Sequence, residues 1–259
     1  EQILSVKYVK RDYKQDQLHI SLATYIAESA ELFSATKYAK KGFPTGSEIN
    51  KDQCPAEDDL KTKAYMRAQP FKKVVGRLNW IVHVCFPSLL YPLRRLQAID
   101  SNPAPMHMKI ALELLGYAYN NKELGLTFHG PNSPFWTEKW YDDSAPNMYI
   151  PGNQDQLVMH FDPTHTVVET DGEFPEVCVV ATLAGACISA VSEKVRTTTR
   201  STAESEGCAA YRCSSVAIAI RKALDELCVY QGPTICYGDN QACLTLARAP
   251  FTSTKTKIW

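Results

Sequence analysis

The segment from Ala203 to Val229 carries a long helical pattern, and one misplaced charge within it constrains the fold more than any other feature. Its apolar residues recur at intervals of three and four, which places them on one stripe of an α-helix. The stripe consists of Ala210, Cys213, Ala217, Ile220, Leu224 and Leu227. Glu206 falls on the same stripe, close to a helix start that Ser201 and Glu204 mark as a predicted capping box. Because a buried carboxylate is costly unless it is neutralised, the fold must compensate Glu206.

Short apolar segments before and after this helix predict β-strands. Residues 156–162 form one expected strand, residues 177–182 and 187–191 a strand pair, and residues 234–237 a short final strand. A second helix is expected from about residue 240 to residue 249. Strands first, and then helix alternating with strand, are typical of a mixed α/β sheet.

The first half of the chain predicts a β-hairpin followed by helices. The hairpin joins residues 3–9 to residues 18–22 across a polar run. Helices are expected over residues 23–33, 65–82 and 106–119, with Pro87 and Pro92 as breaks after the second of them. The following stretch is rich in Pro, Gly, Asn and Trp and is interpreted as a linker. We therefore expect a first unit at 1–130, a linker at 131–154 and a second unit at 155–259.

The charge distribution is more informative than the net charge, which is zero. Residues 1–130 hold 18 basic and 13 acidic side chains, whereas residues 131–259 hold 10 and 15. From Lys61 to Arg95 there are eight basic residues and no acidic one. A zero total argues against nucleic-acid binding, but this basic segment is of the kind that follows a duplex backbone. A merely solvated basic face is the alternative.

Nine cysteines without a Cys-x-x-Cys pair favour reduced thiols in an intracellular protein over disulfides or a zinc site. Six of them lie in apolar runs and are expected to be buried: Cys85, Cys178, Cys187, Cys213, Cys228 and Cys236. The apolar stretch from Leu78 to Leu93 is interrupted by His83 and two prolines. No membrane-spanning helix is therefore predicted.

Two further acids stand at the ends of predicted strands. Asp162 closes the strand at 156–162, and Asp239 follows the apolar strand at 234–237. Ligands gather at the carboxyl ends of strands in open α/β sheets, and three carboxylates brought together repel one another unless a cation intervenes. Magnesium prefers such oxygen ligands, and two metals ~3.5–4 Å apart can hydrolyse a phosphodiester. Asp162, Glu206 and Asp239 thus predict a site for two Mg²⁺ ions, with Mn²⁺ as an alternative. Each acid taken singly fits a turn or helix-dipole role.

Two motifs around these acids resemble the ribonuclease H domain of copia-type retrotransposon polyproteins. One is Arg-Ser-Thr-Ala-Glu-Ser-Glu at 200–206, and the other is Tyr-Gly-Asp-Asn-Gln-Ala at 237–242. The 44-residue step from Asp162 to Glu206 and the 33-residue step to Asp239 also match that family. Asp162 corresponds to the family's first acid, and Asp171 is the competing candidate.

The resemblance extends upstream over nearly the whole chain. Residues 71–80 resemble the segment after the polymerase thumb, and residues 101–128 resemble the connection region. The first hairpin and helix resemble the end of the palm and the start of the thumb. The implied fold is a ribonuclease H-like mixed sheet with flanking helices, preceded by a mainly helical thumb and connection unit with an N-terminal β-hairpin.

The resemblance implies metal-dependent endonucleolytic hydrolysis of the RNA strand of RNA–DNA hybrids, within a retrotransposon reverse transcriptase. Asp162, Glu206 and Asp239 would hold the metal ions. Substrate contacts are expected from Ser201, Thr202, Asn240, Gln241, Lys72 and Lys73. The implied partners are the hybrid and the remainder of the reverse transcriptase polyprotein. No membrane partner is expected, and a dimer is compatible with the resemblance. The expected location is the cytoplasm, with virus-like particles and entry into the nucleus as further sites.

The chain also departs from the family pattern. The polymerase catalytic acids are expected to precede residue 1, because Tyr141-Asp142-Asp143 lacks the spacing and strand of the polymerase turn. The last strand, final helix and fourth acid of the ribonuclease H domain are expected beyond residue 259. The missing fourth acid and the thin match around Asp162 favour a competing hypothesis, a catalytically inactive or domesticated fragment that binds nucleic acid or acts as a scaffold. Another metal nuclease or an integrase of the same superfold is a third hypothesis.

Overall fold

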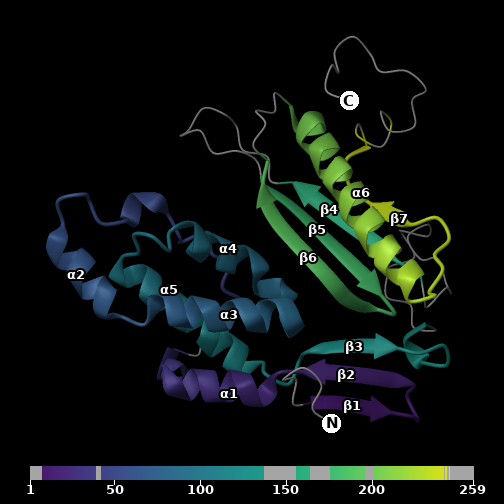
Figure 1. Cartoon of the computed structure of the whole chain (residues 1–259), viewed down its shortest axis with the longest axis horizontal. Helices are drawn as coiled ribbons and strands as arrows, with labels where there is room; N and C mark the ends of the chain where they lie inside the picture. The colour runs from purple at the N-terminus through teal and green to yellow at the C-terminus, as the bar shows by residue number, and fades with distance from the viewer. Residues whose placement is uncertain are drawn as a thin grey trace. The chain divides into compact units, whose positions relative to one another are not determined.

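The computed structural model places two compact units along the chain, Glu1–Phe128 and His129–Trp259, each containing its own β-sheet (Figure 1). The structure describes residues 8–38, 42–136, 156–163, 176–195, 201–241, 243 and 245. Asp171, the Tyr141-Asp142-Asp143 turn and most of the expected linker lie outside these residues. In the described part, no helix has both the length and the apolar character that crossing a membrane requires.

The first sheet is built on the expected N-terminal hairpin. Strand β1 (Tyr8–Asp12) pairs antiparallel with β2 (Gln17–Ser21), and β3 (Leu126–His129) adds a third strand beside β2. The turn is closed by Asp12, whose Oδ1 accepts hydrogen bonds from two successive backbone N–H groups. Strand β1 contains the last two residues of the predicted strand at 3–9 and continues into the polar run as far as Asp12, whereas residues 3–7 lie outside the described residues. Polar side chains are compatible with a strand here because β1 is the edge of its sheet.

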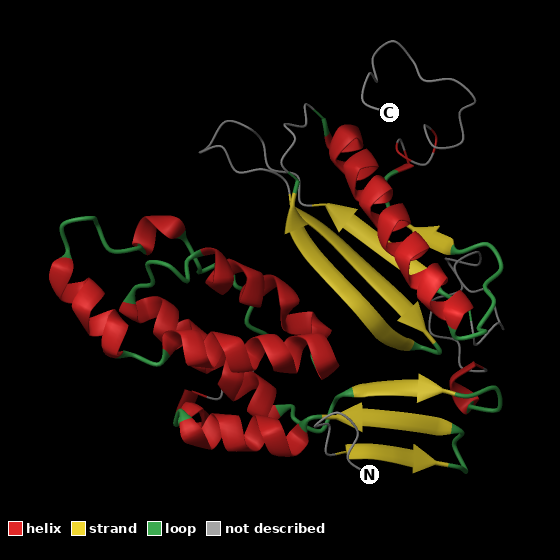
Figure 2. Cartoon of the chain, viewed as in Figure 1, coloured by secondary structure: helices red, strands yellow, loops and turns green. Residues whose placement is uncertain are grey.

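Helices form the rest of the first unit (Figure 2). They are α1 (Ala23–Leu32), α2 (Leu60–Ala68), α3 (Phe71–Cys85), α4 (Leu90–Ala98) and α5 (Pro105–Asn120), with short 3₁₀ turns at Ala35–Tyr38, Lys51–Gln53 and Pro87–Leu89. Helix α5 contacts α1, α3 and α4. Fully buried side chains at this junction include Ile26, Leu78, Ile81, Leu93 and Leu115. The unit therefore has a core of its own, built from the apolar stripes of amphipathic helices.

Two prolines of the first unit affect the helices differently from the prediction. The single helix predicted at 65–82 is wrong, because α2 ends at Ala68 and α3 begins at Phe71. Pro70 separates them: it lacks an N–H group, and it forces the preceding Gln69 into an extended conformation. Pro92 was expected to end a helix, but it lies in the first turn of α4. A proline is tolerated there because first-turn N–H groups have no acceptor within the helix.

The second unit is a four-stranded mixed sheet in the order β6-β5-β4-β7. Its strands are β4 (Val158–Pro163), β5 (Glu176–Leu183), β6 (Ala186–Lys194) and β7 (Ile235–Tyr237). The pairs β4–β5 and β5–β6 are antiparallel, whereas β7 runs parallel to β4. Helix α6 (Thr202–Glu226) lies across one face of this sheet (Figure 1). The expected mixed α/β architecture is confirmed, and this strand order is compatible with a ribonuclease H-like sheet.

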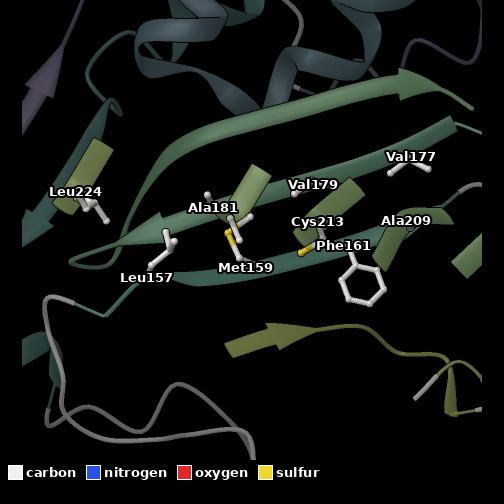
Figure 3. Packing of buried hydrophobic residues seen from close by; sticks show 10 residues of the cluster. Leu157, Met159, Phe161, Val177, Val179, Ala181, Ala209, Cys213 and Leu224 are labelled. Carbon is white, nitrogen blue, oxygen red and sulfur yellow. The ribbon is translucent and has the colours of Figure 1, made fainter. Parts of the chain in front are cut away.

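The core of the second unit joins α6 to the inner face of β4 and β5 (Figure 3). Alternate strand residues contribute to it, as the two-residue period of a strand requires. The buried cluster contains Leu157, Met159, Phe161, Val177, Val179 and Ala181 from the sheet side and Ala209, Cys213, Ala217 and Leu224 from α6. Leu227, predicted on the buried stripe, is instead 72% exposed because α6 ends at Glu226.

Three cysteines predicted to be buried are exposed. Cys178 alternates with Val177 and Val179 and therefore lies on the sheet face away from α6. Cys228 follows the end of α6, and Cys236 lies in the edge strand β7. An apolar run in the sequence does not distinguish the covered face of a strand from its open face, and this is why the prediction was wrong.

Two glycines of the first unit provide a matched test of the packing. Gly125 has a positive φ of 58°, and an added Cβ would overlap the carbonyl oxygen of Ile20. Gly76 lies inside α3 with no atom within 4 Å of the position of an added Cβ. We expect Gly125→Ala to lower the free energy of unfolding by about 1–3 kcal/mol, and Gly76→Ala to raise it by about 0.5–1 kcal/mol. Urea denaturation measures both. Equal effects of the two substitutions would contradict the structure.

Candidate metal centre

Three carboxylates from three separate elements converge in the second unit. Asp162 lies near the end of β4, Glu206 lies near the start of α6, and Asp239 follows β7. One oxygen atom from each of these side chains lies within 4.8 Å of the others. The three acids identified from the sequence are therefore brought together by the fold.

The parallel pairing of β4 with β7 accounts for this convergence. Val158 lies opposite Ile235, and His160 lies opposite Tyr237. The carboxyl ends of the two strands therefore reach the same edge of the sheet, where Asp162 and Asp239 follow. The rings of His160 and Tyr237 stack at a centroid distance of 5.2 Å, which adds a side-chain contact to this short pairing.

The start of α6 is set by its N-cap. Ser201 is in an extended conformation, and its Oγ accepts a hydrogen bond of 3.2 Å from the backbone N–H of Glu204. This contact is one half of the predicted capping box. Because the cap determines where the helix begins, it also determines that Glu206 lies on the face turned towards the sheet. Glu206 is only 4% exposed, in agreement with its place on the apolar stripe.

One oxygen of the buried Glu206 carboxylate is uncompensated among the residues that the structure describes. Its Oε2 atom is buried and has no hydrogen-bond partner among the described residues. Burial, followed by the charges of Asp239 and Asp162, raises the pKa of Glu206 to about 7. Desolvation and the Asp239 carboxylate likewise raise the pKa of Asp162. Two oxygen ligands with raised pKa values, together with an orphaned buried oxygen, fit a divalent cation.

Asp239 is positioned by the glycine before it. An added Cβ at Gly238 would overlap the ring of Phe161, so that the chain can pass this ring only without a side chain. The residue after Asp239 has a structural role, since the Asn240 Oδ1 accepts a hydrogen bond of 2.9 Å from the backbone N–H of Cys243. We had not identified Gly238 or Phe161 from the sequence. A glycine directly before a strand-end acid was the only available signal for either residue.

The other predicted substrate-contacting residues fall into two groups. Ser201, Thr202 and Gln241 are exposed near the three acids in the sequence. Lys72 and Lys73 belong to the first unit, where they occupy the first turn of α3 and are exposed. Both lysines line a pocket of about 700 Å³, whose walls also include Lys63 and Arg67, two further residues of the basic segment from Lys61 to Arg95. The Lys72 Nζ lies 3.8 Å from Asp100 Oδ2.

Comparison with known proteins shows a distant similarity to a transposon polyprotein. Over 99% of its length, the chain is 21% identical to a protein described as the retrovirus-related Pol polyprotein from transposon TNT 1-94 of Nicotiana tabacum. The chain spans 18% of the length of that protein. No family model and no solved structure matches the chain. The similarity supports a retroelement origin and is consistent with a chain that belongs to a larger polyprotein.

The raised pKa of Glu206 predicts a characteristic dependence of stability on pH. Between about pH 4.5 and pH 7, Glu206 is protonated in the folded state and ionised in the unfolded state. The free energy of unfolding should therefore fall as the pH rises through this window, by about 1–3 kcal/mol in the presence of a chelator. Glu206→Gln should remove this part of the decrease. Urea titrations at a series of pH values measure it, and identical slopes in both proteins would contradict the assigned pKa.

The close contact between Gly238 and Phe161 predicts a second effect. Gly238→Ala should lower the free energy of unfolding by about 1–3 kcal/mol, because the added methyl group overpacks against a buried ring. Gly232→Ala is the control, since no atom lies within 4 Å of the position of its added Cβ. Thermal denaturation of the two variants measures the difference. If Gly238→Ala proved as stable as Gly232→Ala, the placement of Asp239 would have to be revised.

Proposed function

We propose that this chain hydrolyses the RNA strand of RNA–DNA hybrids in a metal-dependent reaction, as part of a retrotransposon reverse transcriptase polyprotein. The observation that carries this proposal is the convergence of Asp162, Glu206 and Asp239, with oxygen atoms within 4.8 Å of one another, beside the carboxyl ends of two parallel strands. The distant similarity to a retrovirus-related Pol polyprotein supports a retroelement origin, which is the setting of the proposed reaction.

The three acids divide into one buried and two exposed ligands. Glu206 supplies an oxygen that is already desolvated and unpartnered, so that it gains most from a bound cation. Asp162 and Asp239 are exposed and would face the substrate side of the centre. Two bound Mg²⁺ ions would supply activation of the attacking water and stabilisation of the departing 3′ oxygen. Mn²⁺ fits the same oxygen ligands.

The protein would contribute positioning more than chemistry of its own. The β4–β7 pairing, the N-cap of α6 and the contact of Gly238 with Phe161 hold the three carboxylates before substrate binds. Preorganised charges stabilise a transition state without a reorganisation cost during the reaction. Ser201, Thr202, Asn240 and Gln241 are proposed to contact the substrate. Among such contacts, hydrogen bonds to ribose 2′-hydroxyl groups would distinguish RNA from DNA.

The basic residues of the first unit are proposed to hold the substrate backbone. Lys72 and Lys73 stand at the N-terminal end of α3, in a pocket that also contains Lys63 and Arg67. Cationic side chains and a helix N-terminus both favour phosphate groups. Contacts of this kind contribute affinity but no sequence preference, in agreement with a nuclease that must act along a whole hybrid.

The decisive experiment follows RNA cleavage in a labelled RNA–DNA hybrid with Mg²⁺. Asp239→Asn should reduce the cleavage rate on the order of 100-fold or more, because it removes one charged ligand from the centre. Asp225→Asn is the matched control, since it makes the same charge change at an exposed position near the other end of α6. Its cleavage rate should equal that of the unchanged chain.

Three other results would overturn the proposal in different ways. Hybrid binding without any RNA cleavage by the unchanged chain would support a nucleic-acid-binding or scaffold module. Cleavage that survives Asp239→Asn would mean that the three carboxylates are not the catalytic centre. Cleavage of double-stranded DNA at an equal rate would instead indicate another metal nuclease of the same superfold.

A further inference from the structure

Two cysteines from different elements of the second unit come into contact. Cys213 lies in the middle of α6 and is completely buried. Cys236 is the central residue of β7 and lies opposite Met159 of β4. Paired residues of neighbouring strands project to the same face of a sheet, and Met159 packs in the same cluster as Cys213 (Figure 3). The pairing therefore places Cys236 on the sheet face that α6 covers.

The two thiols are in contact, and their environments differ. The S–H group of Cys213 donates a hydrogen bond to the sulfur of Cys236 and lowers the pKa of the Cys236 thiol to about 7. By contrast, burial raises the pKa of the Cys187 thiol in β6. Cys236 is also exposed, whereas Cys213 is not. One thiol is thus accessible and ionises readily, and its neighbour is shielded from solvent.

We propose that Cys213 and Cys236 are a redox-sensitive pair that a hydroperoxide converts into a disulfide between α6 and β7. In the first step, the Cys236 thiolate attacks one oxygen of hydrogen peroxide and the O–O bond breaks. Cys236 becomes a sulfenic acid, and the other oxygen of the peroxide departs as hydroxide. In the second step, the sulfur of Cys213 attacks the Cys236 sulfur, and the displaced hydroxide leaves as water with the thiol proton of Cys213. The two thiols lose two electrons, and the peroxide gains them.

The location of this bond gives it a structural consequence. It joins α6, which carries Glu206, to β7, which leads into Asp239. Strand β7 is an edge strand of three residues and pairs only with β4 among the described residues, so that few other contacts hold it. A disulfide also closes a loop of the unfolded chain between residues 213 and 236, which stabilises the folded state. In the oxidised protein, β7 and the Asp239 that follows it should therefore be held more firmly to α6.

The inference is tested by mapping the bond itself, so its outcome is independent of the proposed nuclease activity. The full chain is treated with hydrogen peroxide, its remaining thiols are alkylated, and it is digested with trypsin. Cys213 is the only cysteine in the tryptic segment 213–221, whereas segment 223–248 contains Cys228, Cys236 and Cys243. Mass spectrometry should detect these two segments linked, with a loss of two hydrogens that a dithiol reductant reverses.

Single substitutions assign the bond. Cys236→Ser should abolish the link to segment 213–221, and Cys228→Ser should retain it as the matched exposed control. Peroxide should also raise the urea midpoint of the unchanged chain and of Cys228→Ser, but not that of Cys236→Ser. Cys213→Ala supplies a second variant at the buried position, and its Cys236 should accumulate as a sulfinic acid. Two results would overturn the inference. One is a link to segment 213–221 that persists in Cys236→Ser, and the other is a Cys213 thiol of the unchanged chain that is still free for alkylation after peroxide treatment.

Discussion

The second unit is organised around a single buried carboxylate. Glu206 lies on the apolar face of α6, 4% exposed and with one oxygen unpartnered among the described residues. Burying an isolated negative charge costs several kcal/mol, so the fold must protonate it or neutralise it. The raised pKa of Glu206 describes the first solution, and the proposed metal centre describes the second. Both depend on the packing of α6 against β4 and β5, because that packing removes Glu206 from water.

The remaining parts of the centre follow from strand polarity. Since β7 runs parallel to β4, Asp162 and Asp239 come to the same edge of the sheet; an antiparallel β7 would carry Asp239 to the opposite edge. The contact of Gly238 with the Phe161 ring then sets how closely the end of β7 approaches the end of β4. The same pairing brings Cys236 towards Cys213, so that the proposed metal ligands and the proposed redox pair depend on one short strand of three residues.

Periodicity predicted those elements whose stabilising contacts lie within the segment. The helix at 203–229 and the strand pair at 177–182 and 187–191 agree with α6, β5 and β6 to within a few residues. The errors occurred where one residue overrode the pattern or where a partner decided the outcome. Pro70 split a helix that periodicity had joined, and β3 was not expected because its pairing with β2 joins residues more than a hundred positions apart. Cys236 was expected to be buried but is exposed, because an apolar run does not show whether its strand will lie at the edge of a sheet.

The sequence alone determined which acids were available and at what spacing, because a carboxylate on an apolar stripe or at a strand end conflicts with local burial rules. It also carried the distant likeness to a retrotransposon polyprotein. Only the tertiary structure decided that Asp162, Glu206 and Asp239 meet within 4.8 Å, and that two cysteines form a contact. These contacts depend on strand order, direction and register. Such properties arise from pairings between distant segments, and no local pattern of residues encodes them directly.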